Sequence, residues 1–140
     1  MKNLVVITIL ICSVFTLTAQ NDETFTLSIE FEATKYKEGS VLMALYDSED
    51  THMEKPFKTA KAKFVEGKAV ITVDNLPAGE YSFSYFHDLD GDDEIDKNMM
   101  GIPKEPYGFS NGQSGTFGPP SYSDSKIMIE KNTNLNITVK

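Results

Sequence analysis

The residues best suited to chemistry are acidic side chains in one stretch, FHDLDGDDEIDKNMMGIPKEPYGFSNG, which covers residues 86–112. Carboxylates at every second position are how an EF-hand-type loop begins to surround a calcium ion. If Asp88 is the first ligand, Asp90 and Asp92 fall on the third and fifth positions. The pattern then departs from such a loop, because Asp93 replaces the glycine of position six and Met99 replaces the glutamate of position twelve.

Two interpretations of this acidic run remain open. In the first, it binds a hard cation, with calcium as the expected cofactor, through four carboxylates: Asp88, Asp90, Asp92 and Asp96. A cation would relieve the repulsion between crowded carboxylates, which is about 1 kcal/mol per pair at 4 Å even in water. In the second, the run is a solvated turn in which Asp88 and Asp96 accept hydrogen bonds from backbone amides.

His87 stands beside Asp88, but neighbouring residues of a strand point to opposite faces, so the pair does not imply a catalytic dyad. The second histidine of the sequence, His52, lies in a polar segment. We therefore predict no catalytic residues. The alternative is a hydrolase, for example a glycan-directed one, that uses His87 with loop carboxylates from Asp88, Asp96 or Glu105. Glycoside cleavage would need two carboxylates about 5–10 Å apart.

The second half of the stretch combines aromatic rings with glycine and proline, in EPYGFSNG and again in GTFGPPSY. Exposed rings beside glycine can stack on a sugar or a peptide, whereas buried rings anchor a long loop to its domain. The first interpretation predicts these ligand-binding residues: His87, Glu105, Tyr107, Phe109 and Asn111.

The elements that position these residues are predicted to be strands. TFTLSIEFEA alternates apolar and polar residues, and SVLMALYD is apolar on both faces, as in a central strand covered on both sides. Five more strand-like stretches follow without a helical period: residues 59–65, 68–74, 79–87, 126–130 and 134–140. Seven strands predict an all-β fold, a seven-stranded antiparallel β-sandwich of immunoglobulin-like or transthyretin-like type. The predicted core contains Leu27, Ile29, Phe31, Leu45, Ile71, Tyr81, Phe83, Ile137 and Val139.

Two turns and one long loop complete the predicted fold. Glu66–Lys68 is expected to form a tight hairpin in which Gly67 takes a positive φ. LPAGEY, which starts at Leu76, resembles a turn found in transthyretin-like and collagen-adhesin-B-like sandwiches, where its leucine closes the core. Between His87 and Ser125 the periodicity disappears, but aromatic residues recur, which predicts one long ordered loop that packs on itself.

The first residues have the layout of a secretory signal peptide. Lys2 is basic, LVVITILICSVF is apolar, and TLTAQ ends in small or polar residues. Cleavage after Ala19 leaves residues 1–19 as the signal and 20–140 as a single domain. Lipidation of Cys12 is the alternative, and it is disfavoured because the large Ile11 precedes the cysteine.

Composition limits the classes of partner. The chain has 21 acidic residues against 13 basic ones, a net charge of −8 and no arginine, so nucleic acids and anionic lipids are poor partners. After the signal there is no apolar run long enough to span a membrane. Cys12 is the only cysteine, so a mature chain without it relies on its hydrophobic core.

The stretch from LPAGEYSFSYFHDLDGDDEIDKNMMGIPKEPYGFSNG to FGPPSYSDS closely resembles the bacterial domain-of-unknown-function family 2141. The resemblance covers nearly the whole mature chain and includes His87, Asp88, Asp96, Gly101, Pro103, Glu105, Gly108, Phe109, Ser110, Asn111, Pro119 and Asp124. It implies export and a β-sandwich, and it implies no activity. Pro106 stands where relatives carry glycine, which changes the loop backbone only locally.

These observations predict a non-enzymatic binding or interaction module of the bacterial cell envelope, either periplasmic or secreted. Its partner would be a glycan, a peptide or an envelope protein.

Overall fold

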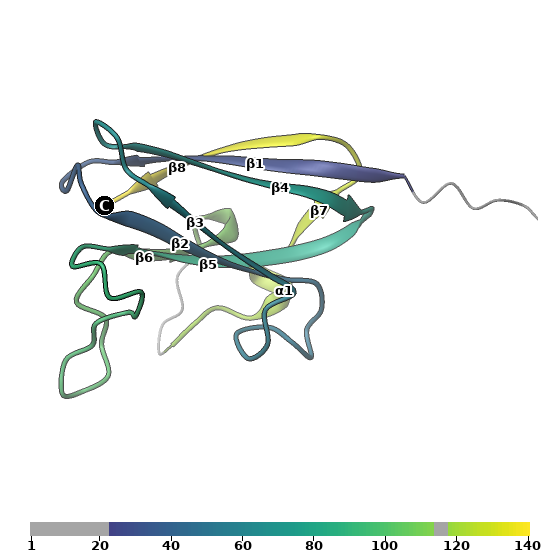
Figure 1. Cartoon of the computed structure of the whole chain (residues 1–140). Coiled ribbons are helices and arrows are strands. Elements are labelled where there is room, and N and C mark those ends of the chain that lie inside the picture. The colour runs from purple at the N-terminus through teal and green to yellow at the C-terminus, as the bar shows by residue number, and fades with distance from the viewer. Residues whose placement is uncertain (1–22, 114–117) are drawn as a thin grey trace, which may run out of the picture.

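The computed structural model describes residues 23–113 and 118–140, so the predicted signal peptide and Cys12 lie outside the described residues (Figure 1). No helix in these two ranges has the length and apolar character needed to cross a membrane. The elements are β1 (Thr24–Ala33), β2 (Ser40–Tyr46), β3 (Lys58–Lys63), β4 (Lys68–Pro77), β5 (Gly79–Asp88), β6 (Tyr107–Phe109), the 3-10 helix η1 (Ser110–Gly112), α1 (Tyr122–Ser125), β7 (Ile127–Ile129) and β8 (Thr133–Val139).

Two sheets pack face to face, which confirms the predicted all-β sandwich (Figure 1). One sheet has three strands in the order β4-β1-β8, and the other has five, in the order β3-β2-β5-β6 with β7 paired to β5. The described ranges contain eight strands instead of the predicted seven. The additional strand is β6, which lies inside the predicted long loop and is only three residues long, too short for an alternating pattern to stand out.

The sandwich is not antiparallel throughout, which corrects the prediction. β1 pairs antiparallel with β4 but parallel with β8, from Leu27 opposite Thr133 to Ala33 opposite Val139. Alternation of apolar and polar residues gives the same inward face in either direction, so the sequence pattern carries no information on strand orientation.

The core lies between the sheets and follows the alternation of the strands. Eight of the nine predicted core residues are buried, including Phe31 and Phe83, which have no exposed surface. Ile137 is only half-buried, because β8 is an edge strand of the three-stranded sheet. Full burial of one large apolar side chain contributes about 1.5–3 kcal/mol, so these residues supply the main stabilisation of a domain without a disulfide.

Both predicted turns are present. Val65 and Lys68 exchange two backbone hydrogen bonds of 2.8 and 3.0 Å, and Gly67 between them has a φ of 81°. At the other turn Leu76 is fully buried, and the Tyr81 hydroxyl donates a hydrogen bond of 2.9 Å to the carbonyl of Pro77. The two turns lie at opposite ends of β4.

Two loops project from the five-stranded sheet on the side away from the core: residues 47–57 and residues 89–106 (Figure 1). β2 is central in this sheet, as predicted, but no element of the described residues covers its second face. Leu42 and Ala44 on that face are only half-buried and border a hollow between the loops. The remainder of the predicted long loop contains β6, η1 and α1.

Candidate functional site

Asp88, the last residue of β5, has a completely buried carboxylate. Its Oδ1 accepts a hydrogen bond of 2.7 Å from the amide of Gly91, and its Oδ2 accepts one of 3.3 Å from the amide of Asp93. Lys61 on β3 places its Nζ 3.5 Å from the same Oδ2 and also pairs with Asp93. Asp88 therefore holds the first turn of the acidic loop against the sheet.

The surroundings of Asp88 keep it ionised. Burial by itself raises the pKa of a carboxyl group, because it disfavours the charged form. Here the amides of Gly91 and Asp93, together with Lys61, outweigh burial, so the pKa of Asp88 lies below its ordinary value of 3.8. The pKa of Lys61 is raised above its ordinary value, chiefly by its hydrogen bond to Asp93. The two groups form a charged pair at neutral pH.

Glu105 binds the other end of the same loop. It is only 6% exposed, and its Oε1 accepts a hydrogen bond of 2.8 Å from the amide of Leu89. Its Oε2 accepts one of 3.2 Å from the amide of Asp96. One carboxylate thus connects the start, the middle and the end of the loop.

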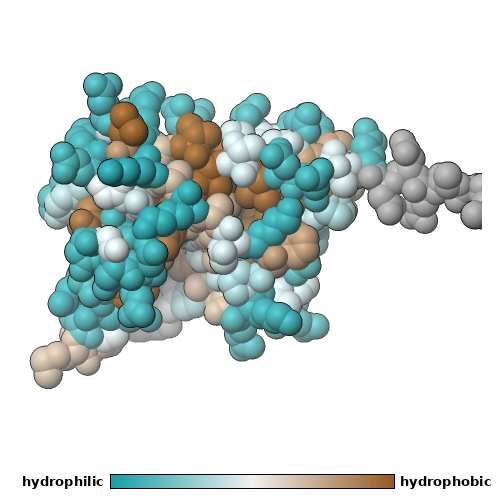
Figure 2. Space-filling view, in the orientation of Figure 1, coloured by the Kyte–Doolittle hydropathy of each residue, from teal (hydrophilic) through white to brown (hydrophobic). Residues whose placement is uncertain are grey.

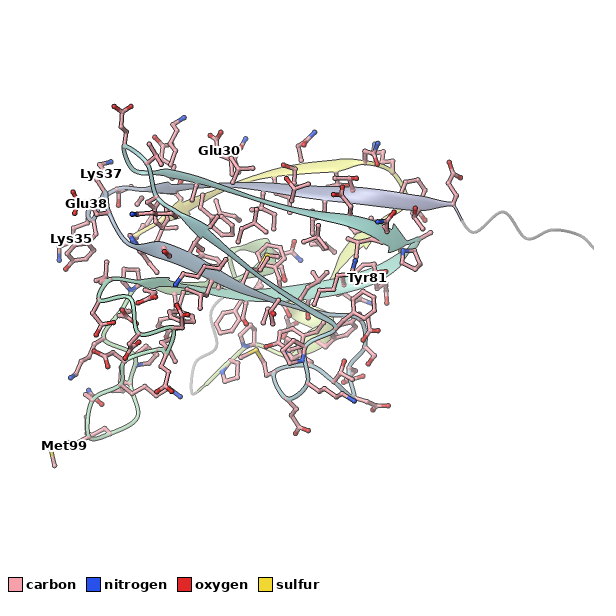
Figure 3. All side chains as sticks on the ribbon, in the orientation of Figure 1. Glu30, Lys35, Lys37, Glu38, Tyr81 and Met99 are labelled. Atoms are coloured by element: carbon pink, nitrogen blue, oxygen red, sulfur yellow. The ribbon has the colours of Figure 1, made fainter. Side chains whose placement is uncertain are left out.

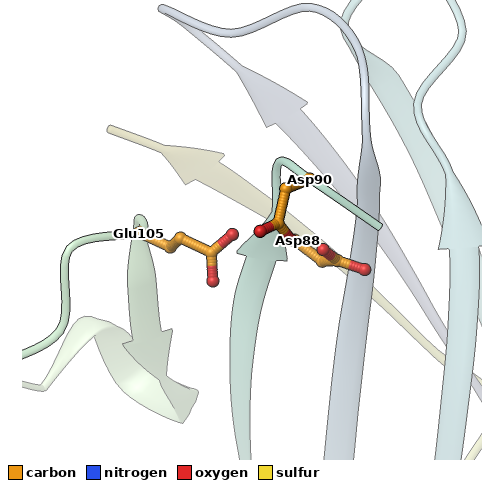
Figure 4. Close-up of side chains that lie close together, drawn as sticks. All are labelled: Asp88, Asp90 and Glu105. Atoms are coloured by element: carbon orange, nitrogen blue, oxygen red, sulfur yellow. The ribbon is translucent and has the colours of Figure 1, made fainter. Parts of the chain in front are cut away.

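Three carboxylates converge at the base of the loop: Asp88, Asp90 and Glu105 (Figure 4). One oxygen from each lies within 4.8 Å of the others, which is the span of two calcium–oxygen bonds of about 2.3–2.6 Å. The donor set therefore fits a calcium ion in charge and spacing, although Asp88 and Glu105 already accept hydrogen bonds from backbone amides.

Two of the four predicted calcium ligands are not part of this group. The Asp92 carboxylate accepts a hydrogen bond of 2.8 Å from the amide of Glu94, two residues further along the chain. Asp96 contributes its backbone amide, which donates to Glu105. The third member of the group is Glu105, which the sequence placed among the ligand-binding residues.

His87 is part of the core. Its ring has no exposed surface, lies 4.2 Å between centroids from the Phe64 ring, and donates from Nε2 to the carbonyl of Glu38 at 2.6 Å. Its Nδ1 is buried without a hydrogen-bond partner in the described part of the chain. This placement offers His87 to neither a ligand nor a substrate.

His52, which lies in a polar segment of the sequence, makes structural contacts as His87 does. Its Nδ1 lies 2.9 Å from Ser82 Oγ, and its Nε2 lies 2.9 Å from the carbonyl of Pro120. The ring also packs edge-on between Tyr46 and Tyr122. Ser82 is fully buried on β5, so the Ser-His contact joins the 47–57 loop to the sheet, and the contact with Pro120 joins the same loop to the segment before α1.

An apolar groove of about 480 Å³ runs under the five-stranded sheet, between the two projecting loops (Figure 2). Its floor is formed by Leu42, Ala44 and Phe86, and its walls by Met53 of one loop and Ile95 of the other. Lys61 and Asp93 close one rim as an ion pair. Pockets of this size and apolar character are typical of ligand sites.

Only some of the predicted ligand-binding residues line this groove. Tyr107, which is 49% exposed, and Phe109 line it, and their rings meet edge-to-face 6.0 Å apart. Asn111 does not reach it, because its side chain donates a hydrogen bond of 2.8 Å to the carbonyl of Lys126. Glu105 and His87 also lie outside the groove.

Sequence reasoning missed the floor of the groove, although a signal was present. SVLMALYD is apolar on both faces. Leu42 and Ala44 lie on the outer face, where a strand that buries only its inner face would carry polar residues. That pattern was interpreted as a strand covered on both sides. The structure shows that the second face is an open surface instead.

The family described as an uncharacterized protein conserved in bacteria (DUF2141) matches residues 29–138. The chain belongs to this family. The match runs from within β1 to within β8, so it includes strands of both sheets and the two projecting loops. No curated protein and no solved structure matches the chain.

Proposed function

We propose that this DUF2141 protein is a non-enzymatic binding module that docks an apolar peptide segment of another envelope protein in the groove under its five-stranded sheet. The observation that carries the proposal is the groove itself, an apolar surface on the outer side of a sheet whose inner side already supplies the core.

The chemistry of the lining favours a peptide with apolar side chains over a glycan. Sugars require several hydrogen-bonding groups around the ring, whereas the lining of the groove is mostly aliphatic and aromatic. Its polar groups are the hydroxyls of Thr59, Ser84, Tyr85 and Tyr107 and the Lys61–Asp93 ion pair at one rim. Met53 at one wall has a flexible thioether side chain that can adapt to different apolar partners. Tyr107 at the other wall presents a large ring that is half exposed.

The position of His87 supports a role in binding rather than catalysis. A general base must come within hydrogen-bond reach of its substrate, and His87 is enclosed by Phe64 and the Glu38 carbonyl. The hydrolase alternative needs loop carboxylates that act together with His87. Two of them, Glu105 and Asp88, already accept hydrogen bonds from backbone amides of the loop. The apolar segment after Lys2 supports export as part of the same proposal.

A peptide selection against the folded domain tests this function. Displayed random peptides are selected on the wild-type protein, and their dissociation constants are measured by fluorescence anisotropy. We expect peptides rich in apolar and aromatic residues that bind at least tenfold more weakly to Leu42→Glu and to Met53→Glu. Met53 lies on an exposed loop, so its variant remains informative if Leu42→Glu reduces stability.

The matched control is Val70→Glu, which introduces the same charge on the outer face of the three-stranded sheet, where Val70 is exposed. Its peptide affinity should stay within twofold of wild type. Peptides that bind both groove variants as tightly as the wild type, or a selection that yields no binders, would contradict the proposal.

Calcium binding is a second proposal, favoured by the convergence of Asp88, Asp90 and Glu105 within 4.8 Å. A cation there would join both ends of the 89–106 loop, whose Asp93 and Ile95 form one wall of the groove. Lys61 already supplies one positive charge to Asp88, which lowers the benefit of a metal ion and is consistent with weak affinity.

A further inference from the structure

A second hollow, of about 330 Å³, lies at the end of the sandwich where the β1–β2 connection meets the segment before β6. Three parts of the chain surround it: Lys35 and Tyr36, residues 104–107, and Lys140 after β8. Figure 3 places Lys35 at this end of the molecule, beside the chain end marked in Figure 1. The hollow is separate from the apolar groove and shares only Tyr107 with it.

The charge of this hollow is opposite to that of the whole chain. Lys35, Lys104 and Lys140 line it in a protein whose net charge is −8. In the described residues, none of the three lies within an ion pair, whereas Lys61, Lys68 and Lys126 do. Glu105 is the one acidic side chain of the lining, and both of its oxygens accept hydrogen bonds from loop amides, so three lysines against one carboxylate leave the lining side chains net positive.

Two aromatic rings border the same hollow. Tyr36 is 39% exposed and Tyr107 is 49% exposed, so both present ring surface to solvent. The Nζ of Lys35 lies 4.7 Å from the centroid of the Tyr36 ring, which holds one cation beside one aromatic face. Aromatic faces next to free ammonium groups match a ligand that has an apolar ring face and an anionic substituent.

We propose that this hollow binds an acidic saccharide, a sugar ring that carries a carboxylate or a sulfate. The C–H face of the sugar packs on Tyr36 and Tyr107, and the lysines bind its anionic group. A free inorganic anion would use the lysines but not the rings, and an acidic peptide would not need a flat apolar face. The site has Tyr107 in common with the peptide groove and otherwise uses different residues.

Calorimetric titrations with defined probes test this assignment. The probes are an oligogalacturonate, its fully methyl-esterified neutral form, sodium sulfate and a hexaglutamate peptide. We expect the oligogalacturonate to bind at least tenfold more tightly than each of the other three, and its affinity to fall with added salt because the contacts are ionic.

Variants identify the residues. Lys35→Gln combined with Lys104→Gln, and separately Tyr36→Leu, should each weaken oligogalacturonate binding about tenfold. Lys131→Gln, an exposed lysine outside the hollow, should leave it unchanged, and so should Leu42→Glu in the groove. Equal binding of the methyl ester or of hexaglutamate, no effect of Tyr36→Leu, or no binding of any acidic sugar would each overturn the proposal.

Discussion

The outer faces of the two sheets differ in polarity, although the inner faces of both sheets carry the apolar residues of the core. The three-stranded sheet has polar cross-strand rows, Thr72–Ser28–Asn134 and Lys68–Glu32–Thr138. The five-stranded sheet has the largely apolar row Lys61–Leu42–Phe86–Tyr107, with a projecting loop on either side. A sandwich requires apolar residues only on the faces that meet. The second apolar face therefore adds nothing to the core, and this difference is the reason that we propose binding on the five-stranded sheet.

The two regions also differ in what holds them together. Both sheets depend on buried apolar side chains, whereas the 89–106 loop depends on two buried carboxylates that accept backbone amide hydrogen bonds. Changes in the core should therefore affect both sheets, and changes in the carboxylates should affect mainly the loop and the groove that it borders.

The largest effect is expected from Phe83→Ala, which removes a fully buried ring between the sheets. Loss of a buried aromatic side chain costs about 3–5 kcal/mol of unfolding free energy. Urea denaturation measures the loss, with Val70→Ala on the polar outer face as a control that should change stability by less than about 0.5 kcal/mol. A loss below about 1 kcal/mol for Phe83→Ala would show that this ring is not a core element.

Glu105→Gln should have the next largest effect and should act on the loop. The variant retains one acceptor oxygen for two amide donors, so about 1–3 kcal/mol is lost through an unpaired buried group. Amide hydrogen exchange at Leu89 and Asp96 should accelerate, while exchange in β1 and β4 stays slow. The exposed Glu94→Gln is the control, and an equal change in both variants would argue against the structural role of Glu105.

Calcium should produce a smaller effect on the same loop. A dissociation constant of about 0.1–1 mM is expected for an extracellular type of site, and at ten times that concentration a single site adds about 1.4 kcal/mol. Thermal unfolding with calcium, magnesium or chelator measures it. Asp90→Asn should abolish the shift and Asp92→Asn, whose side chain lies outside the group, should retain it. A melting temperature unaffected by about 10 mM calcium would show that the acidic run is a solvated turn and does not bind calcium.

The smallest effect is the acid sensitivity contributed by Asp88. Its pKa is lower in the folded than in the unfolded state, so it stabilises the fold above its ordinary value of 3.8. That contribution is lost as the pH falls through the folded-state pKa. Urea unfolding from about pH 6 downward should therefore show a steeper loss of stability for the wild type than for Asp88→Asn. Identical slopes would mean that Asp88 carries no favourable charge interaction in the folded protein.

Much of the fold was predictable because the information is local. Alternating residues in β1 and β4 identify the inward face directly, and the Glu66–Lys68 turn follows from the backbone freedom of Gly67. The long segment between His87 and Ser125 was predicted to be ordered because it contains aromatic residues, and its described parts have defined structure. Asp88 was identified as a residue that bonds loop amides in one of the two interpretations, and it does so.

Features that depend on residues far apart in the chain were decided by tertiary structure alone. β1 and β8 pair in parallel across about a hundred residues, and Glu105 instead of Asp92 or Asp96 joins Asp88 and Asp90. The basic hollow combines Lys35, Lys104 and Lys140, which no local pattern connects. A periodic pattern tells which side chains point inward, because backbone geometry alternates them. It cannot tell which segments meet, because that depends on how the whole chain packs its apolar surface and pairs its buried charges.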